Sequence, residues 1–219
     1  MKKSKIVVVD DHPIVRHGIA LLLDDTDDLR VCGQAGTAKE VLPLLEKTRP
    51  DLVLLDLFLQ GTIAVELIRK IRERFPNLPI LVLSVQSEAL FAERALQAGA
   101  DGYVVKEEAT AEILQAIQAL LEGGVYVSKK LVDRMSFKVV TGDSRSREFV
   151  AKLSDRELQV LKLLGDGASI REAAADLALS AKTVETHCAR IKRKLHLRNA
   201  NELLRFAAQW QSQLSGISR

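Results

Sequence analysis

The sequence predicts an α/β domain with a doubly wound, five-stranded parallel sheet, followed by a small all-α domain of four helices. In the N-terminal half, five short apolar runs alternate with stretches of 3.6-residue periodicity, and short helices with clear start signals follow near the C-terminus. The net charge also differs in sign between the two parts of the chain. The first 128 residues hold 14 basic and 19 acidic side chains, whereas the remainder holds 18 and 10. A basic half indicates a polyanionic partner, although a solvated basic surface would carry the same charge.

The five predicted strands are mostly aliphatic, as expected of strands that are buried on both faces. They occupy residues 6–9, 29–32, 52–55, 80–83 and 102–105. The predicted helices between and after them occupy residues 13–24, 37–48, 61–74, 88–98 and 109–122. Pro13 suits the first turn of a helix, where no backbone N–H is needed. Strands and helices that alternate in this way form a parallel sheet with helices on both faces.

The composition excludes several classes of protein. No apolar run approaches the roughly 20 residues of a membrane-spanning helix, and the run that follows the N-terminal lysines stops at Asp10, which is too early for a signal peptide. Cys32 and Cys188 lack metal-ligand spacing and are typical of reduced thiols in a cytosol. We therefore expect a cytoplasmic protein without a membrane partner. Its predicted parts are a first domain over 1–128, a linker over 129–150 and a second domain over 151–219.

Polar side chains follow four of the predicted strands at their carboxyl ends. Asp10 and Asp11 follow the first strand, and Asp56, Ser84 and Lys106 follow the third, fourth and fifth. In doubly wound sheets these ends meet at the edge where ligands bind. Three carboxylates there repel one another unless a cation lies among them, and oxygen ligands favour Mg²⁺. Each Asp alone could be a helix cap and the lysine could be solvated, but together they indicate a site for Mg²⁺ and a phosphoryl group.

These motifs make the N-terminal half similar to the receiver domain of bacterial two-component response regulators, which has a flavodoxin-like fold. The matching segments lie within residues 4–125 and read VVVDDHPIVRHGI, DLVLLDL, LVLS and AGADGYVVK. The resemblance implies that Asp56 accepts a phosphoryl group from a sensor histidine kinase. It also implies that Asp11 binds Mg²⁺ directly, that Asp10 binds it mostly through water, and that the backbone carbonyl of Phe58 completes the protein ligands with Asp56.

The resemblance assigns three further residues to the response to phosphorylation. Ser84 and Lys106 would contact phosphoryl oxygens, and Tyr103 would move inward when Ser84 moves, unless it is an ordinary core or edge tyrosine. After the acceptor the family usually has Met-Pro-Gly, whereas this chain has Leu59-Gln60-Gly61, so we expect an altered loop there. Gln86, two residues past Ser84, would flank the path of the water that hydrolyses the acyl phosphate.

The sequence predicts four short helices in the C-terminal part. Ser154 and Glu157 form a predicted capping box at the start of the first, and Ser180 is the predicted cap of the third. A tight turn at 178–180 between two short helices, the second of them basic, indicates a helix-turn-helix. In the third helix the predicted core stripe consists of Val184, Cys188, Ile191 and Leu195.

Residues 153–208 resemble the LuxR/NarL/FixJ-type DNA-binding domain through the segments LSDRELQVLKLL, SAKTVETHCARIKRKL and NELLRFA. The resemblance implies that the third helix enters the major groove and that the fourth helps to pair two domains. Without it, the basic face would be that of an ordinary solvated helix. The residues that would face bases are Lys182, Glu185, Thr186, Ala189 and Arg190. Those that would mostly contact phosphates are Thr183, His187, Arg193 and Lys194.

Together the two resemblances predict a response regulator that is not an enzyme. It would be phosphorylated on Asp56, pair as a homodimer, bind double-stranded promoter DNA and act on the transcription machinery. One alternative is a Mg²⁺-dependent phosphohydrolase, but Phe58 stands where a second carboxylate would be needed. Another is a regulator that binds DNA without phosphorylation. For Trp210, a place in the small core and a place in a dimer contact are equally good interpretations.

Overall fold

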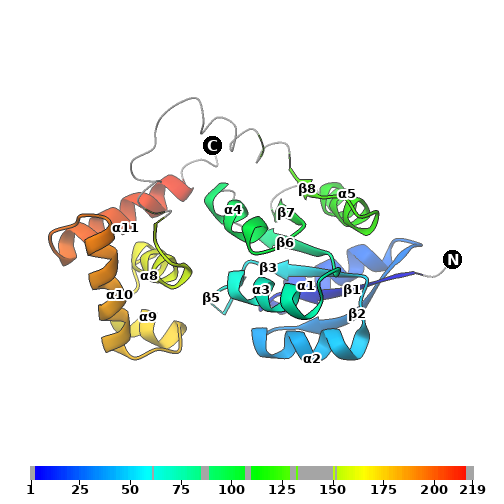
Figure 1. Ribbon diagram of the computed structural model, residues 1–219, viewed down its shortest axis with the longest axis horizontal. Coiled ribbons are helices and arrows are strands. Elements are labelled where there is room, and N and C mark those ends of the chain that lie inside the picture. Colours follow the sequence, from blue (N-terminus) through cyan, green and yellow to red (C-terminus); the bar gives the residue numbers. More distant parts are fainter. Residues whose placement is uncertain are drawn as a thin grey trace. The chain divides into compact units, whose positions relative to one another are not determined.

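The computed structural model describes residues 3–60, 62–84, 89–106, 110–128, 132, 150 and 152–215. The chain forms two compact units, one of them α/β and the other all-α (Figure 1). Almost all of the predicted 129–150 linker lies outside the described residues, and so does Gln86.

A six-stranded sheet forms the centre of the α/β unit. Its strand order is β2-β1-β3-β6-β7-β8, and every neighbouring pair is parallel. A separate two-stranded sheet consists of β4 (Phe58–Leu59) and β5 (Thr62–Ile63). The strands of the large sheet are β1 (Ser4–Val9), β2 (Leu29–Ala35), β3 (Leu52–Asp56), β6 (Ile80–Ser84), β7 (Gly102–Val105) and β8 (Tyr126–Val127).

Helices cover both faces of this sheet (Figure 1). Ile6 and Val8 of β1 share a buried cluster with residues of α1 and α5. Val7 and Val9, which point to the other face because side chains alternate along a strand, are buried as well. The sheet is therefore covered on both sides, as the aliphatic strands require. The helices are α1 (Pro13–Asp24), α2 (Ala38–Thr48), α3 (Val65–Arg74), α4 (Ala89–Gln97) and α5 (Thr110–Leu121).

The fold class is confirmed, with two differences in the elements. The sheet has a sixth strand, β8, because Gly123 takes a left-handed φ of 84° after α5 and returns the chain to the edge beside β7. The helix expected over 61–74 begins only at Val65, because the preceding segment forms the β4–β5 hairpin. Gln60 in this hairpin has a φ of 50°, and the Ala64 N–H donates to the Leu57 carbonyl at 2.7 Å across its base.

The all-α unit has its predicted helix starts. The Ser154, Ser169 and Ser180 side chains each accept a hydrogen bond from the backbone N–H three residues on. A side chain at Gly165 would place its Cβ 2.7 Å from the Ala207 carbonyl oxygen, so glycine allows α8 and α11 to pack closely. The helices are α8 (Asp155–Gly165), α9 (Ile170–Asp176), α10 (Ala181–Lys194) and α11 (Ala200–Ser215).

Within the described ranges of both units, no helix has the length and apolar character that a membrane span requires.

Candidate functional site

The polar residues predicted to meet at one edge of the sheet lie at the carboxyl ends of its central strands. Asp10 directly follows β1, Asp56 is the last residue of β3, and Ser84 is the last residue of β6. Lys106 directly follows β7. All three of Asp10, Asp56 and Ser84 are buried, with 1 %, 5 % and 0 % of their surface exposed. The apolar strands that carry them therefore bring two carboxylates out of bulk water.

Lys106 joins the two buried carboxylates. Its Nζ lies 2.5 Å from Oδ2 of Asp10 and 3.1 Å from Oδ1 of Asp56. Its backbone N–H donates to the Ser84 carbonyl oxygen at 2.7 Å, which fixes the end of β7 beside that of β6. One ammonium thus partly compensates two negative charges, so the edge keeps an excess of negative charge.

Burial raises the pKa of Asp56 to about 6, and the neighbouring Asp10 carboxylate acts in the same direction. Lys106 and the Phe58 backbone N–H, which donates to the carboxylate, act in the opposite direction without cancelling this shift. The ionised form of Asp56 is therefore disfavoured unless a further positive charge binds nearby.

The oxygen atoms at this edge fit a divalent cation. Ligand atoms of Asp10, Asp11, His12 and Asp56 all lie within 4.8 Å of one another. Three of the four groups are carboxylates, which are the ligands that Mg²⁺ prefers, and the site has an excess of negative charge to offset. Asp10, Asp11 and Asp56 could hold the ion. For Phe58 the structure gives the N–H contact to Asp56, and the role of its carbonyl stays a prediction.

His12 is the member of this group that the sequence reasoning missed. Its backbone N–H donates to Oδ1 of Asp10 at 2.8 Å, and its Nδ1 lies 3.2 Å from that same oxygen. Nδ1 is also 2.9 Å from Oδ1 of Asp11. The signal was its position directly after Asp10 and Asp11, where a β-strand end and a helix start hold three consecutive side chains near one point.

Two aromatic residues, Tyr103 and Phe58, have defined surroundings in the α/β unit. Tyr103, on β7, has no exposed surface, so the structure describes it in an inward position. The ring of Phe58 meets that of Phe91 on α4 edge to face, with centroids 5.4 Å apart. The altered loop after Asp56 is thus packed against α4 through an aromatic pair that the sequence pattern did not indicate.

The third helix of the all-α unit has the two faces that the sequence predicts. Val184, Cys188, Ile191 and Leu195 are buried, which confirms the core stripe. Arg193, a predicted phosphate contact, is exposed, and Thr183 and His187 are half-buried. Exposed side chains include all five that were predicted to face bases, namely Lys182, Glu185, Thr186, Ala189 and Arg190.

Lys194 is engaged within its own unit. Its Nζ lies 2.6 Å from Oε2 of Glu157 on α8, and it donates to the Lys152 carbonyl at 3.1 Å. Burial raises the pKa of Glu157, but Lys194 and the Ser154 N–H outweigh it, so the pKa lies below its ordinary value of 4.5. This pair anchors the end of α10 to α8 and leaves less of the Lys194 charge for a phosphate.

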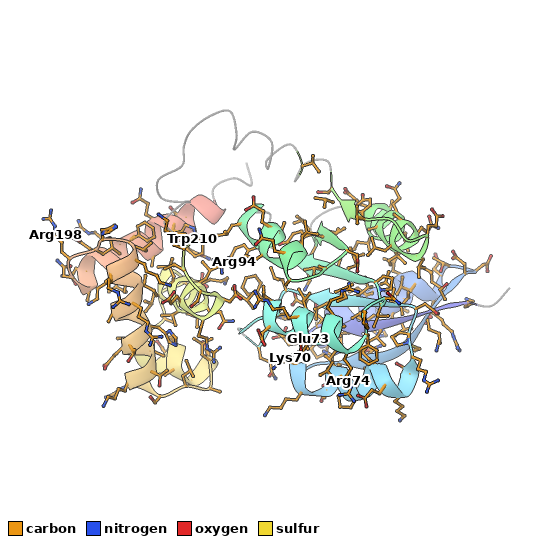
Figure 2. The ribbon with its side chains drawn as sticks, viewed as in Figure 1. Lys70, Glu73, Arg74, Arg94, Arg198 and Trp210 are labelled. Carbon is orange, nitrogen blue, oxygen red and sulfur yellow. The ribbon has the colours of Figure 1, made fainter. Side chains whose placement is uncertain are left out.

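His187 and Trp210 also have defined surroundings. Burial and the charge of Arg190 lower the pKa of His187, and its Nδ1 is buried without a hydrogen-bond partner among the described residues. The contact of His187 with a phosphate stays a prediction. Trp210, labelled in Figure 2, is 5 % exposed, which favours a place in the core. Leu204 on the same helix is 46 % exposed, so α11 has an apolar residue on its outer side.

Two family models match the chain, one for each unit. Residues 6–118 match the response regulator receiver domain, and residues 151–207 match the bacterial regulatory proteins of the luxR family. The chain belongs to the response regulators that combine a receiver domain with a LuxR-type helix-turn-helix. It is therefore a DNA-binding transcription regulator of the two-component class and not an enzyme, and the phosphohydrolase alternative is wrong.

Relatives with this domain organisation align over almost the whole chain. The response regulator GacA of Pseudomonas aeruginosa is 34% identical over 205 residues, which cover 94% of this chain and 95% of that protein. The Fimbriae Z protein of Salmonella typhimurium is 34% identical over 207 residues, or 94% and 97% of the two chains.

The chain is also similar to solved structures. RcsB from Salmonella enterica serovar Typhimurium, bound to promoter P1flhDC in the presence of the phosphomimetic BeF₃⁻, is 26% identical with a TM-score of 0.67. That match covers 95% of this chain and 100% of RcsB. A LuxR-family response regulator from Aurantimonas sp. SI85-9A1 is 36% identical with a TM-score of 0.61, over 64% of this chain and 99% of that one.

Proposed function

We propose that this response regulator takes a phosphoryl group from a sensor histidine kinase onto Asp56 and, as a phosphorylated homodimer in the cytoplasm, binds promoter DNA and acts on the transcription machinery. One observation carries the first half of the proposal. The Lys106 ammonium lies between two buried carboxylates, Asp10 and Asp56, at the edge where a doubly wound sheet binds its ligands.

In the transfer step an oxygen of Asp56 attacks the phosphorus of a phosphohistidine. The P–N bond breaks, its electron pair stays on the imidazole, and an acyl phosphate forms on Asp56. Lys106 is within reach of the acceptor oxygen and would follow the new negative charge onto the phosphoryl group. The Ser84 hydroxyl would donate to a second phosphoryl oxygen. Mg²⁺ held by Asp10, Asp11, Asp56 and the Phe58 carbonyl would supply charge stabilisation for the phosphoryl oxygens.

The second half of the proposal rests on the exposed face of α10. Lys182, Glu185, Thr186, Ala189 and Arg190 lie on that face, opposite the buried stripe of the helix. A helix of this kind fits the major groove, where Arg190 can read guanine and Glu185 can accept from cytosine. Arg193, Thr183 and His187 would contact phosphates, with a smaller contribution from Lys194. Two units on one DNA would contact half-sites about one helical turn apart.

Whole-protein mass tests the acceptor. With acetyl phosphate and Mg²⁺ the wild type should gain one phosphoryl group, Asp56→Asn should gain none, and the exposed Asp27→Asn control should behave as the wild type. Stoichiometric labelling of the Asn variant would refute the assignment of Asp56. DNA binding measured before and after labelling separates the remaining alternative, because a regulator that works without phosphorylation would bind equally in both states.

Salt titration of DNA binding tests the contacts of α10. Arg193→Ala should weaken binding to all DNA sequences. It should also reduce the steepness of log K against the logarithm of the salt concentration by about one. Arg190→Ala should relax discrimination at one base pair by about 1 to 3 kcal/mol. Arg205→Ala, an exposed arginine on α11, is the matched control and should leave base discrimination unchanged. Equal effects of all three variants would contradict a base-reading role for Arg190.

A further inference from the structure

We propose that His12 makes the acidic edge a mixed nitrogen–oxygen site that binds first-row transition-metal dications such as Ni²⁺ through Nδ1 of His12, Asp10 and Asp11. This rests on the metal site of the proposed function and adds a ligand to it. The ligand atoms of the three side chains and of Asp56 are mutually within 4.8 Å, and His12 is the one member that offers nitrogen.

The spacing of the ligand atoms fits neighbouring positions around one ion. Nδ1 of His12 is 2.9 Å from Oδ1 of Asp11 and 3.2 Å from Oδ1 of Asp10. In an octahedral shell with bonds of about 2.1 Å, adjacent ligands lie about 3 Å apart. Nδ1 of His12 can therefore occupy a position next to either of these oxygens in one coordination shell with small movements.

Lys106 directs an incoming cation toward His12. Its ammonium contacts Oδ2 of Asp10 and Oδ1 of Asp56, so a cation at those oxygens would meet a like charge. Oδ1 of Asp10 is instead the oxygen that contacts the backbone N–H and Nδ1 of His12. A cation bound to Oδ1 of Asp10 is consequently within reach of the imidazole.

The position of His12 in the chain makes the imidazole available as a ligand. His12 is the N-cap of α1, with Pro13 after it, and its backbone N–H is held by Asp10 at 2.8 Å. The backbone is thus fixed while the side chain is 69% exposed. The tautomer with its proton on Nε2 presents Nδ1 to an ion, and the ring can turn toward that ion without any rearrangement of the core.

The donor set predicts which cations gain from His12. Mg²⁺ takes oxygen ligands and keeps several waters, so the carboxylates serve it without the imidazole. Imidazole suits Ni²⁺, Zn²⁺ and Cu²⁺, and the affinity of such a site rises along the series from Mn²⁺ to Cu²⁺. The imidazole therefore acts as a specificity-determining ligand that favours these ions over Mg²⁺.

Calorimetry on the untagged full-length protein tests this with Ni²⁺ and Mg²⁺ in separate titrations. His12→Phe keeps the backbone N–H and the ring and removes the nitrogens. We expect it to lower Ni²⁺ affinity by at least about tenfold, the lower limit seen when even an outer-shell partner is lost, without lowering Mg²⁺ affinity. His17→Phe, an exposed histidine on the same helix, is the control and should bind Ni²⁺ as the wild type does.

Unchanged Ni²⁺ affinity in His12→Phe, or a parallel loss of both ions, would overturn the proposal. Imidazole nitrogen spectra of the wild type give a second readout that does not depend on the variant's folding. Zn²⁺ should shift one Nδ1 resonance among the four histidines of the chain, and absence of such a shift would also overturn it. Neither result affects the proposed function, which is tested separately by phosphorylation of Asp56 with Mg²⁺ and acetyl phosphate.

Discussion

Replacing the acceptor should stabilise the metal-free protein. In Asp56→Asn the carboxylate that burial disfavours becomes a neutral amide of the same shape. Asp56 has a pKa of about 6 in the folded chain against an ordinary value of 3.8, a shift of about two units. At about 1.4 kcal/mol per unit, the ionised carboxylate costs the α/β unit about 2 to 3 kcal/mol at pH 7.

Urea unfolding in EDTA, followed by far-UV circular dichroism, measures this gain. With a denaturant dependence of about 2 kcal/mol per molar urea, the midpoint of the α/β unit should rise by about 1 M or somewhat more. The single tryptophan, Trp210, lies in the other unit, so its fluorescence should show no change and serves as an internal control. Asp27→Asn, which alters an exposed carboxylate, should leave both transitions in place.

The pH dependence of unfolding tests the sign of this stability difference between the wild type and Asp56→Asn. Because the pKa of Asp56 is higher in the folded chain, the folded state binds more protons between about pH 4 and 6. The wild type should therefore lose stability relative to Asp56→Asn as the pH rises through this window, and Mg²⁺ at pH 7 should restore part of it to the wild type alone. An Asn variant that is no more stable than the wild type in EDTA at pH 7 would refute the reasoning.

Three further predictions concern stability, lifetime and control. Lys194→Met leaves the buried Glu157 carboxylate without its ammonium and should destabilise the all-α unit by about 3 kcal/mol. Glu157→Gln should cost less, because it leaves a cation that can reach water. Urea unfolding followed by tryptophan fluorescence compares the two variants, and equal losses of stability would contradict this asymmetry. Gln86→Ala should lengthen the acyl-phosphate lifetime if that side chain orients the attacking water, since Phe58 has no polar group to do so; an unchanged decay would exclude the role. If the acidic half masks the basic half, the fragment 151–219 should bind half-site DNA more tightly than the unphosphorylated full chain at equal salt, and equal affinity would leave dimerisation as the control.

Features that depend on consecutive residues were predictable from the sequence. The aliphatic runs gave the central strands because a strand covered on both faces needs apolar residues at every position. Asp10, Asp56, Ser84 and Lys106 could be placed together because the carboxyl ends of parallel strands meet at one edge, whatever the details of packing. The serine caps of the helices were predictable for the same reason, since a cap and its N–H partner lie three residues apart.

Features that depend on contacts between distant residues were not predictable in this way. The pairing of β8 with β7 joins two residues to a sheet edge, which is too short a segment for a periodic pattern. The Glu157–Lys194 ion pair spans 37 positions and became visible only when α8 and α10 packed together. The β4–β5 hairpin depends on a left-handed backbone conformation at Gln60, which cannot be predicted from the residue type.

The same apolar strands that make the sheet stable also make its edge unfavourable for charge. Strand β3 is buried at all five positions, so its last residue, Asp56, reaches the edge without leaving the low-dielectric interior. Because Lys106 compensates only part of the charge of Asp10 and Asp56, the free energy of this edge depends strongly on what binds there. A cation or a phosphoryl group changes the charge balance at the ends of β1, β3, β6 and β7 together. A change at one carboxylate can therefore alter the positions of Ser84, Lys106 and the Phe58–Phe91 pair, which is the physical requirement for a switch built at the edge of a rigid sheet.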